Sequence, residues 1–194
     1  MSESREVVHE EAAVRILRLD PQADAEVLHS WVSEERASFW GMNGLTRDQV
    51  AEIYAHLDTL DTHHAFLVQR DGVPAALLQT YEPEADRVSE CYDVLPGDIG
   101  VHMLLAPPGP EGGRPGWTAG LVRAILSYVL IGLDRQRVVV DPDVANEKAV
   151  ARFLKQGFEA GPLVTLPEID IPDVYLPEKK AQLAFLRREV AFPG

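Results

Sequence analysis

The chain has 194 residues, 46% of them hydrophobic, which is enough for one domain with its own apolar core. Its 18 basic and 31 acidic residues give a net charge of −13, which argues against binding to a nucleic-acid backbone. That charge would attract a cationic substrate, although an acidic surface more often serves solubility, and the single cysteine, Cys91, excludes an intrachain disulfide and fits a reducing cytoplasm.

The N-terminal segment shows no sign of export. Residues 1–11 are mostly polar and charged, so they predict a disordered tail, and they lack the apolar core of a signal peptide. No later apolar run approaches the thickness of a bilayer. We therefore expect a cytoplasmic protein in which residues 1–194 form a single domain without membrane contact.

A strand and two helices are predicted next. Val14–Leu19 is typical of a strand, and Ala23–Glu35 has apolar residues at helical spacing. Thr46 begins a second helix, because Gln49 stands three residues later in the position of a capping box.

A β-hairpin is the clearest local signal. His64–Arg70 and Val73–Tyr81 are β-rich runs, and Asp71–Gly72 between them suits a tight turn. Glu82–Gly97 is acidic and contains prolines, which favours an exposed connection, and Asp98–Ala106 is predicted to be the next strand.

The second half of the chain alternates helices and strands. Trp117–Gly132 is predicted to be a helix that follows a Pro/Gly-rich loop, and Val138–Val140 is a buried strand that ends at Asp141-Pro142-Asp143. A helix with Ala149, Phe153 and Leu154 on one stripe follows, capped by Asp143 or Asn146. The predicted remainder is a strand at Leu163–Leu166, a loop at Pro167–Pro177 and a strand at Ala181–Arg187.

This order of elements resembles the GNAT superfamily of acyl-CoA-dependent N-acyltransferases over nearly the whole chain. The resemblance implies an α/β fold: a single GNAT-like domain with a mixed, mostly antiparallel sheet flanked by helices. It also implies that the sheet is splayed between its fourth and fifth strands, which are Asp98–Ala106 and the strand through Val138–Val140.

The resemblance implies a binding site for acyl-CoA, with acetyl-CoA or succinyl-CoA as co-substrate. Backbone N–H groups of the loop before the Trp117 helix would hold the pyrophosphate. Gly113, Gly116 and Thr118 stand where the family shows Gln or Arg, Gly, and Gly or Ala, so a plain surface loop is the competing interpretation. The implied acyl-CoA contacts are Met103, Leu104, Gly113, Arg114, Gly116, Trp117, Thr118, Asn146 and Phe153.

Two motifs resemble a narrower group, the siderophore-biosynthesis acyltransferases that acylate hydroxylamines. They are Gly97–His102, which reads Gly-Asp-x-Gly-x-His, and Pro142–Asn146, which reads Pro-Asp-x-x-Asn. The resemblance implies that His102 is the general base and that Asp143 is its partner or an acid, with a backbone N–H near Met103 or Leu104 as the oxyanion hole. A lone strand histidine is more often structural.

Three further residues carry weaker predictions. Phe39 and Trp40 would line an apolar tunnel for an alkyl chain, with core packing as an equal alternative. Phe153 occupies the position of the tyrosine that many GNAT enzymes use to protonate the leaving thiolate, so solvent or another group must supply that proton. Four histidines show no metal-ligand spacing, which predicts no metal site: His29, His56, His63 and His64.

The function implied is transfer of an acetyl or succinyl group to the hydroxylamine nitrogen of an N-hydroxylated diamine such as N-hydroxycadaverine. The product is a hydroxamate for siderophore biosynthesis, as in desferrioxamine pathways. An aminoglycoside N-acetyltransferase is the alternative enzyme, against which His102 and Phe153 count. A non-catalytic GNAT-like module that binds acyl-CoA or a partner protein is a third hypothesis, which the unusual glycine loop leaves open. Both enzyme hypotheses predict a small-molecule amine or hydroxylamine substrate, and the oligomeric state is left open.

Overall fold

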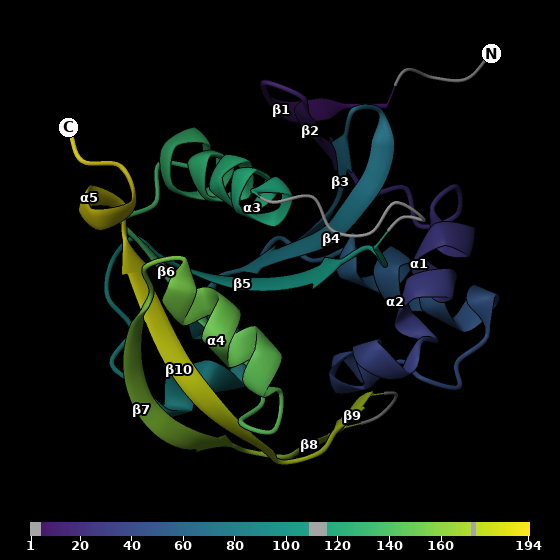
Figure 1. Cartoon of the computed structure of the whole chain (residues 1–194). Coiled ribbons are helices and arrows are strands. Elements are labelled where there is room, and N and C mark those ends of the chain that lie inside the picture. Colours follow the sequence, from purple (N-terminus) through teal and green to yellow (C-terminus); the bar gives the residue numbers. More distant parts are fainter. Residues whose placement is uncertain (1–4, 109–115, 172–173) are drawn as a thin grey trace. The chain divides into compact units, whose positions relative to one another are not determined.

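The computed structural model describes residues 5–108, 116–171 and 174–194. The chain divides into two compact units. The first consists of residues 1–80 and 103–128, and the second of residues 81–102 and 129–194. The fold is α/β, with a mixed, mostly antiparallel arrangement of strands and flanking helices, as predicted (Figure 1).

Strands and helices of the first unit follow the chain order. They are β1 (Val7–Glu11), β2 (Val14–Arg18), α1 (Ala25–Val32), η1 (Glu35–Trp40), α2 (Arg47–Leu57), β3 (His63–Arg70), β4 (Val73–Tyr81), the end of β5 (Asp98–Leu105) and α3 (Trp117–Ser127). Strands β1, β2 and β3 pair antiparallel in that order. Helices α1 and α2 cover a core that includes Leu28, Val50, Tyr54, Leu67 and Leu77.

Two local predictions in this unit are confirmed. The Thr46 side chain accepts from the Gln49 N–H, and the Gln49 side chain accepts from the Thr46 N–H, which completes the capping box of α2. At the hairpin turn, Asp71 and Gly72 both adopt positive φ, at 53° and 77°. Both signals are short-range, so the sequence alone was sufficient for them.

The second unit contains four neighbouring strands, one of which is the beginning of β5, together with short helices and a two-stranded ribbon. Its further elements are given in chain order. They are η2 (Pro83–Ala85), η3 (Arg87–Glu90), β6 (Arg137–Val140), α4 (Glu147–Lys155), β7 (Glu159–Leu166), β8 (Ile169–Ile171), β9 (Val174–Leu176), β10 (Lys179–Arg187) and α5 (Arg188–Ala191). The strand order is β5-β6-β10-β7. β5 and β6 are parallel, and the other two pairs are antiparallel. α4 lies against β10 (Figure 1).

The pairing of β5 with β6 is short. It begins at Asp98↔Arg137, where the Arg137 guanidinium donates to both oxygens of the buried Asp98 carboxylate over 2.7 Å. It ends at Gly100↔Val139, although β5 continues to Leu105. The Asp98–Arg137 ion pair fixes the register where the pairing of β5 with β6 begins. After Gly100 and Val139 the two strands are no longer paired, and this is where the splay was predicted.

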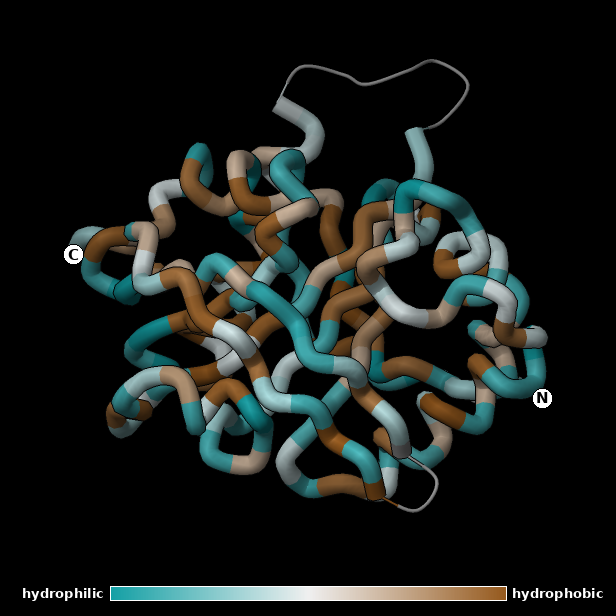
Figure 2. Tube along the Cα trace, turned by 90° about the horizontal axis from the view of Figure 1, so that it is seen from below, coloured by the Kyte–Doolittle hydropathy of each residue, from teal (hydrophilic) through white to brown (hydrophobic). Residues whose placement is uncertain are grey.

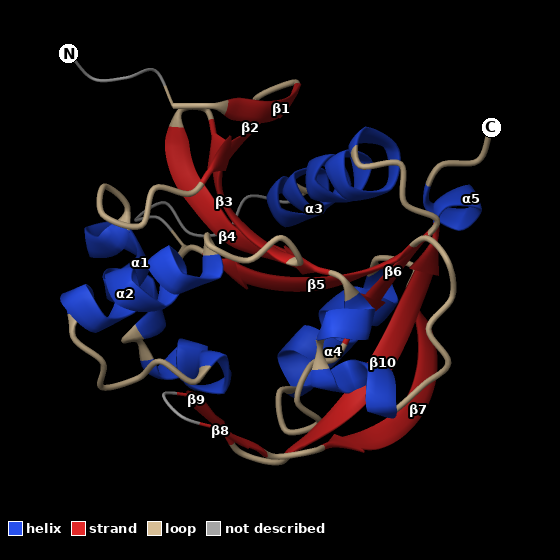
Figure 3. Ribbon diagram, turned by 180° about the vertical axis from the view of Figure 1, so that it is seen from behind, coloured by secondary structure: helices blue, strands red, loops and turns tan. Residues whose placement is uncertain are grey.

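Strand β7 is the last strand of this order and pairs with β10. Its register with β10 shifts between Gln182 and Ala184, opposite a stretch that contains Gly161 and Pro162. Leu163 on this strand is 71% exposed. The β8–β9 ribbon continues from the ends of β7 and β10 (Figure 3).

Several boundaries differ from the sequence-based predictions. Val7–Glu11, expected within a disordered tail, forms β1 because it pairs with β2. The predicted loop at Pro167–Pro177 contains the β8–β9 ribbon, and the helix from Trp117 gives way to a π-helical turn at Tyr128–Gly132. The apolar stripe of α4 is present, but no residue of α4 is fully buried.

Apolar stretches along the trace in Figure 2 are short and are interrupted by polar residues. None of the helices in the described ranges is long and apolar enough to cross a bilayer.

Candidate active site

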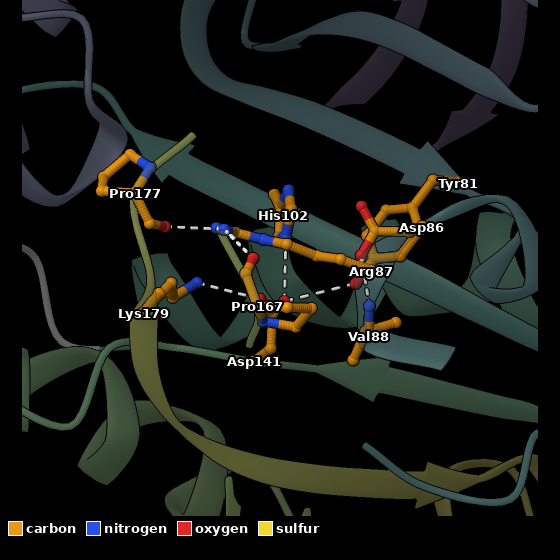
Figure 4. Close-up of polar contacts among 9 residues, drawn as sticks. All are labelled: Tyr81, Asp86, Arg87, Val88, His102, Asp141, Pro167, Pro177 and Lys179. Carbon is orange, nitrogen blue, oxygen red and sulfur yellow. Dashed lines mark hydrogen bonds and ion pairs between the residues drawn. The ribbon is translucent and has the colours of Figure 1, made fainter. Parts of the chain in front are cut away.

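Asp141 is the centre of the candidate active site, which lies in the second unit (Figure 4). It follows β6 directly, and its side chain is 4% exposed. His102 of β5 contacts Oδ1 through Nε2 at 2.8 Å, and Lys179 of β10 donates from Nζ to Oδ2 at 2.8 Å. Tyr81 of β4 donates its hydroxyl hydrogen to Oδ1 at 3.2 Å. Three strands, β4, β5 and β10, thus bring side chains to one carboxylate at the end of β6.

This carboxylate is ionised despite its burial. Burial by itself would raise the pKa of Asp141, but the His102 imidazole and the Lys179 ammonium group beside it, and the hydrogen bonds from both, lower it well below its usual range. Charge-assisted hydrogen bonds of this kind are among the stronger ones in proteins. Asp141 therefore acts as a fixed negative charge and as an acceptor of hydrogen bonds.

The ionised carboxylate determines the tautomer of His102. A carboxylate can only accept, so the Nε2 of His102 must be the protonated nitrogen that donates to it. In the neutral ring, Nδ1 then carries the lone pair and is the atom able to take a proton. The side chain of His102 is 35% exposed, so the ring is only partly covered. An oriented, partly exposed imidazole is suited to general base catalysis.

Tyr81 contacts both His102 and Asp141. It is fully buried, and burial, together with the negative charges of Asp141 and Asp86, raises its pKa well above the usual value, so it stays a neutral donor. Its ring centroid lies 4.9 Å from that of His102. The same ring packs on the backbone at Gly100, where any side chain would clash with it.

Arg87 ties down the chain on both sides of the β8–β9 ribbon. Its Nη1 donates to the carbonyl oxygens of Pro167 and Pro177, at 2.9 and 2.7 Å (Figure 4). Pro177 lies two residues before Lys179, and Lys179 itself pairs with the buried Leu166 of β7. The backbone that presents Lys179 to Asp141 is therefore held from two sides.

The carboxylate that contacts His102 is Asp141. Asp143 was expected to be the partner of His102 or an acid, and the first of these two expectations is corrected. The Asp143 side chain accepts from the Ala145 N–H at 2.8 Å, within the turn that leads into α4, and its backbone bridges to Ala181. Pro142 separates the two aspartates. Asp141 therefore stays at the end of β6, next to His102, while Asp143 belongs to the turn that leads into α4. A catalytic role for Asp143 remains a prediction.

The α4 residues of the predicted acyl-CoA contacts also lie in the second unit. Asn146 caps α4, since its side chain accepts from the Ala149 N–H at 3.2 Å, which confirms the capping interpretation and leaves its acyl-CoA role a prediction. Phe153 packs edge-on against Phe158 with ring centroids 5.2 Å apart.

The first unit holds the other predicted contacts. Gly116, at φ 76°, is the N-cap of α3, and among the described residues no side-chain cap is present. The first N–H groups of α3, at Trp117 and Thr118, therefore suit a phosphate group. Met103 and Leu104 lie on β5. Gly113 and Arg114 lie outside the described residues.

Phe39 and Trp40 differ in their surroundings. Phe39 is 48% exposed at the end of η1. Trp40 packs against the core of the first unit, and its Nε1 donates to the Tyr54 hydroxyl oxygen at 3.2 Å. These contacts fit the core-packing interpretation of Trp40, and substrate contacts of Phe39 and Trp40 both stay predictions.

Three residues of the candidate site were not predicted as site residues from the sequence. Asp141 was expected only as the end of a strand and Tyr81 only as part of a hairpin, and no prediction was made for Lys179. Asp141 and Lys179 are 38 positions apart, and Tyr81 and Asp141 are 60 apart. The only sequence signal was an aspartate directly after a buried strand. Among the described residues, no group of three potential His, Cys, Asp or Glu ligands could hold a metal.

A family model described as an acetyltransferase (GNAT) domain matches residues 20–166. The chain therefore belongs to the GNAT acetyltransferases.

Two enzyme groups stand among its curated relatives. The N(6)-hydroxylysine O-acetyltransferase of Escherichia coli is 27% identical over 157 residues, which are 79% of this chain and 47% of the relative, so the alignment spans about half of the length of that protein. The aminoglycoside N(6')-acetyltransferase type 1 of Serratia marcescens is 25% identical over 89% of this chain and 86% of its own. A N-hydroxyputrescine acetyltransferase of Acinetobacter baumannii is 29% identical over 43% of this chain and 38% of its own.

Solved structures share the fold. The aminoglycoside acetyltransferase AAC(6')-Ib, in complex with coenzyme A, has a TM-score of 0.73 at 24% identity, covering 92% of this chain and 96% of its own. The spermidine N-acetyltransferase of Vibrio cholerae, in complex with coenzyme A and spermine, has a TM-score of 0.66 at 16% identity, covering 93% of this chain and 99% of its own.

Proposed function

We propose that the protein transfers an acetyl or succinyl group from acyl-CoA to the hydroxylamine nitrogen of an N-hydroxylated diamine, such as N-hydroxycadaverine. The product is a hydroxamate of the kind used in siderophores. The observation that carries this proposal is the 2.8 Å hydrogen bond between His102 Nε2 and the ionised, buried Asp141. It supports an imidazole held in one tautomer beside the splayed strand ends.

His102 is the general base in this proposal. The acceptor nitrogen attacks the thioester carbonyl, a C–N bond forms, the C–S bond breaks, and coenzyme A leaves as its thiolate. The proton released by the nitrogen passes to Nδ1 of His102, while Nε2 continues to donate to Asp141. The acyl-CoA supplies the activated acyl group. With Phe153 at the usual tyrosine position, the thiolate takes its proton from solvent or from another group.

A hydroxylamine acceptor fits this base better than an alkylamine does. A hydroxylamine nitrogen is less basic than an alkylamine, so it arrives largely neutral near pH 7 and needs a base only for the proton released on attack. A histidine is suited to that step because its proton exchange falls near neutral pH. The cationic end of a diamine also suits a chain of net charge −13. Two relatives have names that include hydroxylated amines.

We also propose roles for residues that would bind acyl-CoA and the acceptor. Gly116, Trp117 and Thr118 bind the pyrophosphate of acyl-CoA through the uncapped first turn of α3, and Gly113, Arg114, Asn146 and Phe153 contribute further contacts. A backbone N–H at Met103 or Leu104 forms the oxyanion hole. Phe39 and Trp40 contact the alkyl chain of the acceptor.

An aminoglycoside acceptor is the second candidate, because the relative from Serratia marcescens aligns over most of both chains. The measurement that separates the candidates is consumption of acetyl-CoA and succinyl-CoA with N-hydroxycadaverine, cadaverine and kanamycin as acceptors. We expect turnover with the hydroxylamine and a product that gives the coloured Fe(III) complex of a hydroxamate. O-acylation would give no such colour, and turnover with kanamycin alone would establish the alternative.

The test of the base uses a matched pair of histidine variants. We expect His102→Gln to lower kcat/KM by about 10²- to 10⁴-fold, the usual range for general base catalysis. His56→Gln, on the exposed face of α2, is the control and should match the native protein. Equal rates for the native protein and His102→Gln would remove His102 from the mechanism. Acyl-CoA binding without turnover on any acceptor would favour a non-catalytic module.

A further inference from the structure

Lys179 and His102 share one carboxylate. Lys179 donates to Oδ2 of Asp141, and His102 to Oδ1, each at 2.8 Å (Figure 4). The Asp141 side chain is 4% exposed and that of Lys179 is 24% exposed, so water screens this pair only weakly. Among the described residues, Lys179 is the partner of Asp141 that carries a permanent charge, since the contact with His102 is an ion pair only when the ring is protonated.

The number of charges at this site decides what His102 can do. A buried carboxylate is costly unless a positive charge lies beside it. Without Lys179, a proton on the imidazole would be the only positive charge in contact with the carboxylate, and a protonated imidazole cannot accept another proton. Lys179 supplies a permanent positive charge on the other oxygen. The carboxylate is then neutralised while the imidazole remains uncharged.

We propose that Lys179 is a positioning residue that balances the charge of Asp141, so that His102 rests in its neutral, proton-accepting form. This inference rests on the proposed role of His102 as general base. Lys179 makes no contact with substrate in this account. It acts through Asp141, and its charge matters more than the hydrogen bond it donates.

The other polar groups around the carboxylate do not supply this charge. Tyr81 is a neutral donor to Oδ1. Asp86 accepts from the Val88 N–H. Arg87 is also a cation, but it donates to two backbone carbonyl groups and, among the described residues, forms no ion pair with Asp141. Cys91 donates to the Thr165 carbonyl oxygen, and burial raises the pKa of its thiol, so it stays uncharged near neutral pH.

The strand geometry supports this role. Lys179 is the first residue of β10 and pairs with the buried Leu166, while Arg87 holds the carbonyl of Pro177 just before it. The next residue along the strand, Lys180, is exposed on the opposite side of the pleat. Lys179 can therefore be tested by substitution, with the neighbouring Lys180 as the control position.

The decisive experiment compares Lys179→Gln and Lys179→Met with Lys180→Met and the native protein. Glutamine keeps a donor for Oδ2 without the charge, and it serves if methionine prevents folding. Two quantities are measured: the dependence of kcat/KM on pH with N-hydroxycadaverine, and the pH midpoint of the His102 imidazole followed by NMR. The second readout needs no turnover.

For both Lys179 variants we expect the acid limb of kcat/KM and the NMR midpoint to move to higher pH by about one to three units, the usual effect of a single nearby charge. Activity should recover above the new limb, and Lys179→Arg should restore the native profile. Lys180→Met should leave both curves unchanged.

A uniform loss of rate at every pH, with an unmoved NMR midpoint, would overturn the inference and leave Lys179 with a structural role alone. If the native protein acylates none of the acceptors, the proposed function fails, but the NMR midpoints still decide whether Lys179 sets the protonation of His102. The two failures are therefore distinguishable.

Discussion

Gly100 and Tyr81 fit together without room for one further carbon atom. A Cβ built on Gly100 would lie 2.0 Å from Cζ of the Tyr81 ring and 2.2 Å from Cε2. The Tyr81 ring thus packs directly against the backbone of β5 at Gly100. The hydroxyl group of Tyr81 donates to Oδ1 of Asp141. The second glycine of the Gly-Asp-x-Gly-x-His motif is explained by this contact.

Replacing Gly100 with alanine should therefore disturb both stability and activity. We expect Gly100→Ala to lower the free energy of unfolding by about 1–3 kcal/mol, the range for overpacking a core. Urea denaturation measures this loss. The double variant with Tyr81→Leu should lose less than the sum of the two single variants, because the smaller side chain leaves room. Strict additivity would show that the Tyr81 ring is not what excludes a side chain at Gly100.

The two aspartates beside Pro142 should behave differently. Asp141→Asn removes the carboxylate that orients His102, and we expect kcat/KM to fall by about 10²- to 10⁴-fold. Asp143→Asn keeps an oxygen for the Ala145 N–H and should lower turnover less. Acyl-CoA binding, measured by calorimetry, should survive both changes. A loss in Asp143→Asn as large as that in Asp141→Asn would give Asp143 the catalytic role that the motif predicted.

Asp141 should also make stability depend on pH in the acid range. Its pKa in the folded protein lies below the ordinary value of 3.8, so the unfolded chain takes up a proton first. The ionised Asp141 therefore stabilises the folded protein fully when the pH is above 3.8. As the pH falls below 3.8, this contribution to the free energy of unfolding is lost by about 1.4 kcal/mol per pH unit. In urea denaturation, the difference between native protein and Asp141→Asn should shrink between pH 5 and pH 3. A constant difference would contradict the assigned pKa direction.

Much of the fold could be predicted from the sequence because its signals are local. The capping box at Thr46 and the turn at Asp71–Gly72 each depend on residues within a few positions. Strands β1, β8 and β9 were missed for the opposite reason. Each has three to five residues, and such short segments become strands only through a partner that the sequence pattern does not reveal.

The candidate site was predicted only in part. His102 stood out because of its motif, but its partner was placed two residues too far along the chain. Which of Asp141 and Asp143 faces the ring depends on where β6 ends and how Pro142 turns the backbone. Lys179 reaches Asp141 through the pairing of β10 with β6, and no short pattern contains that information.

The irregular margin of β7 has a consequence for solubility. Pro162 offers no N–H to a neighbouring strand, and the register shift opposite it interrupts the regular ladder. A strand of another molecule would find no continuous row of donors and acceptors there. The exposed leucine at position 163 therefore lies beside an irregular ladder, which is a poorer template for a strand of another molecule than a regular edge would be.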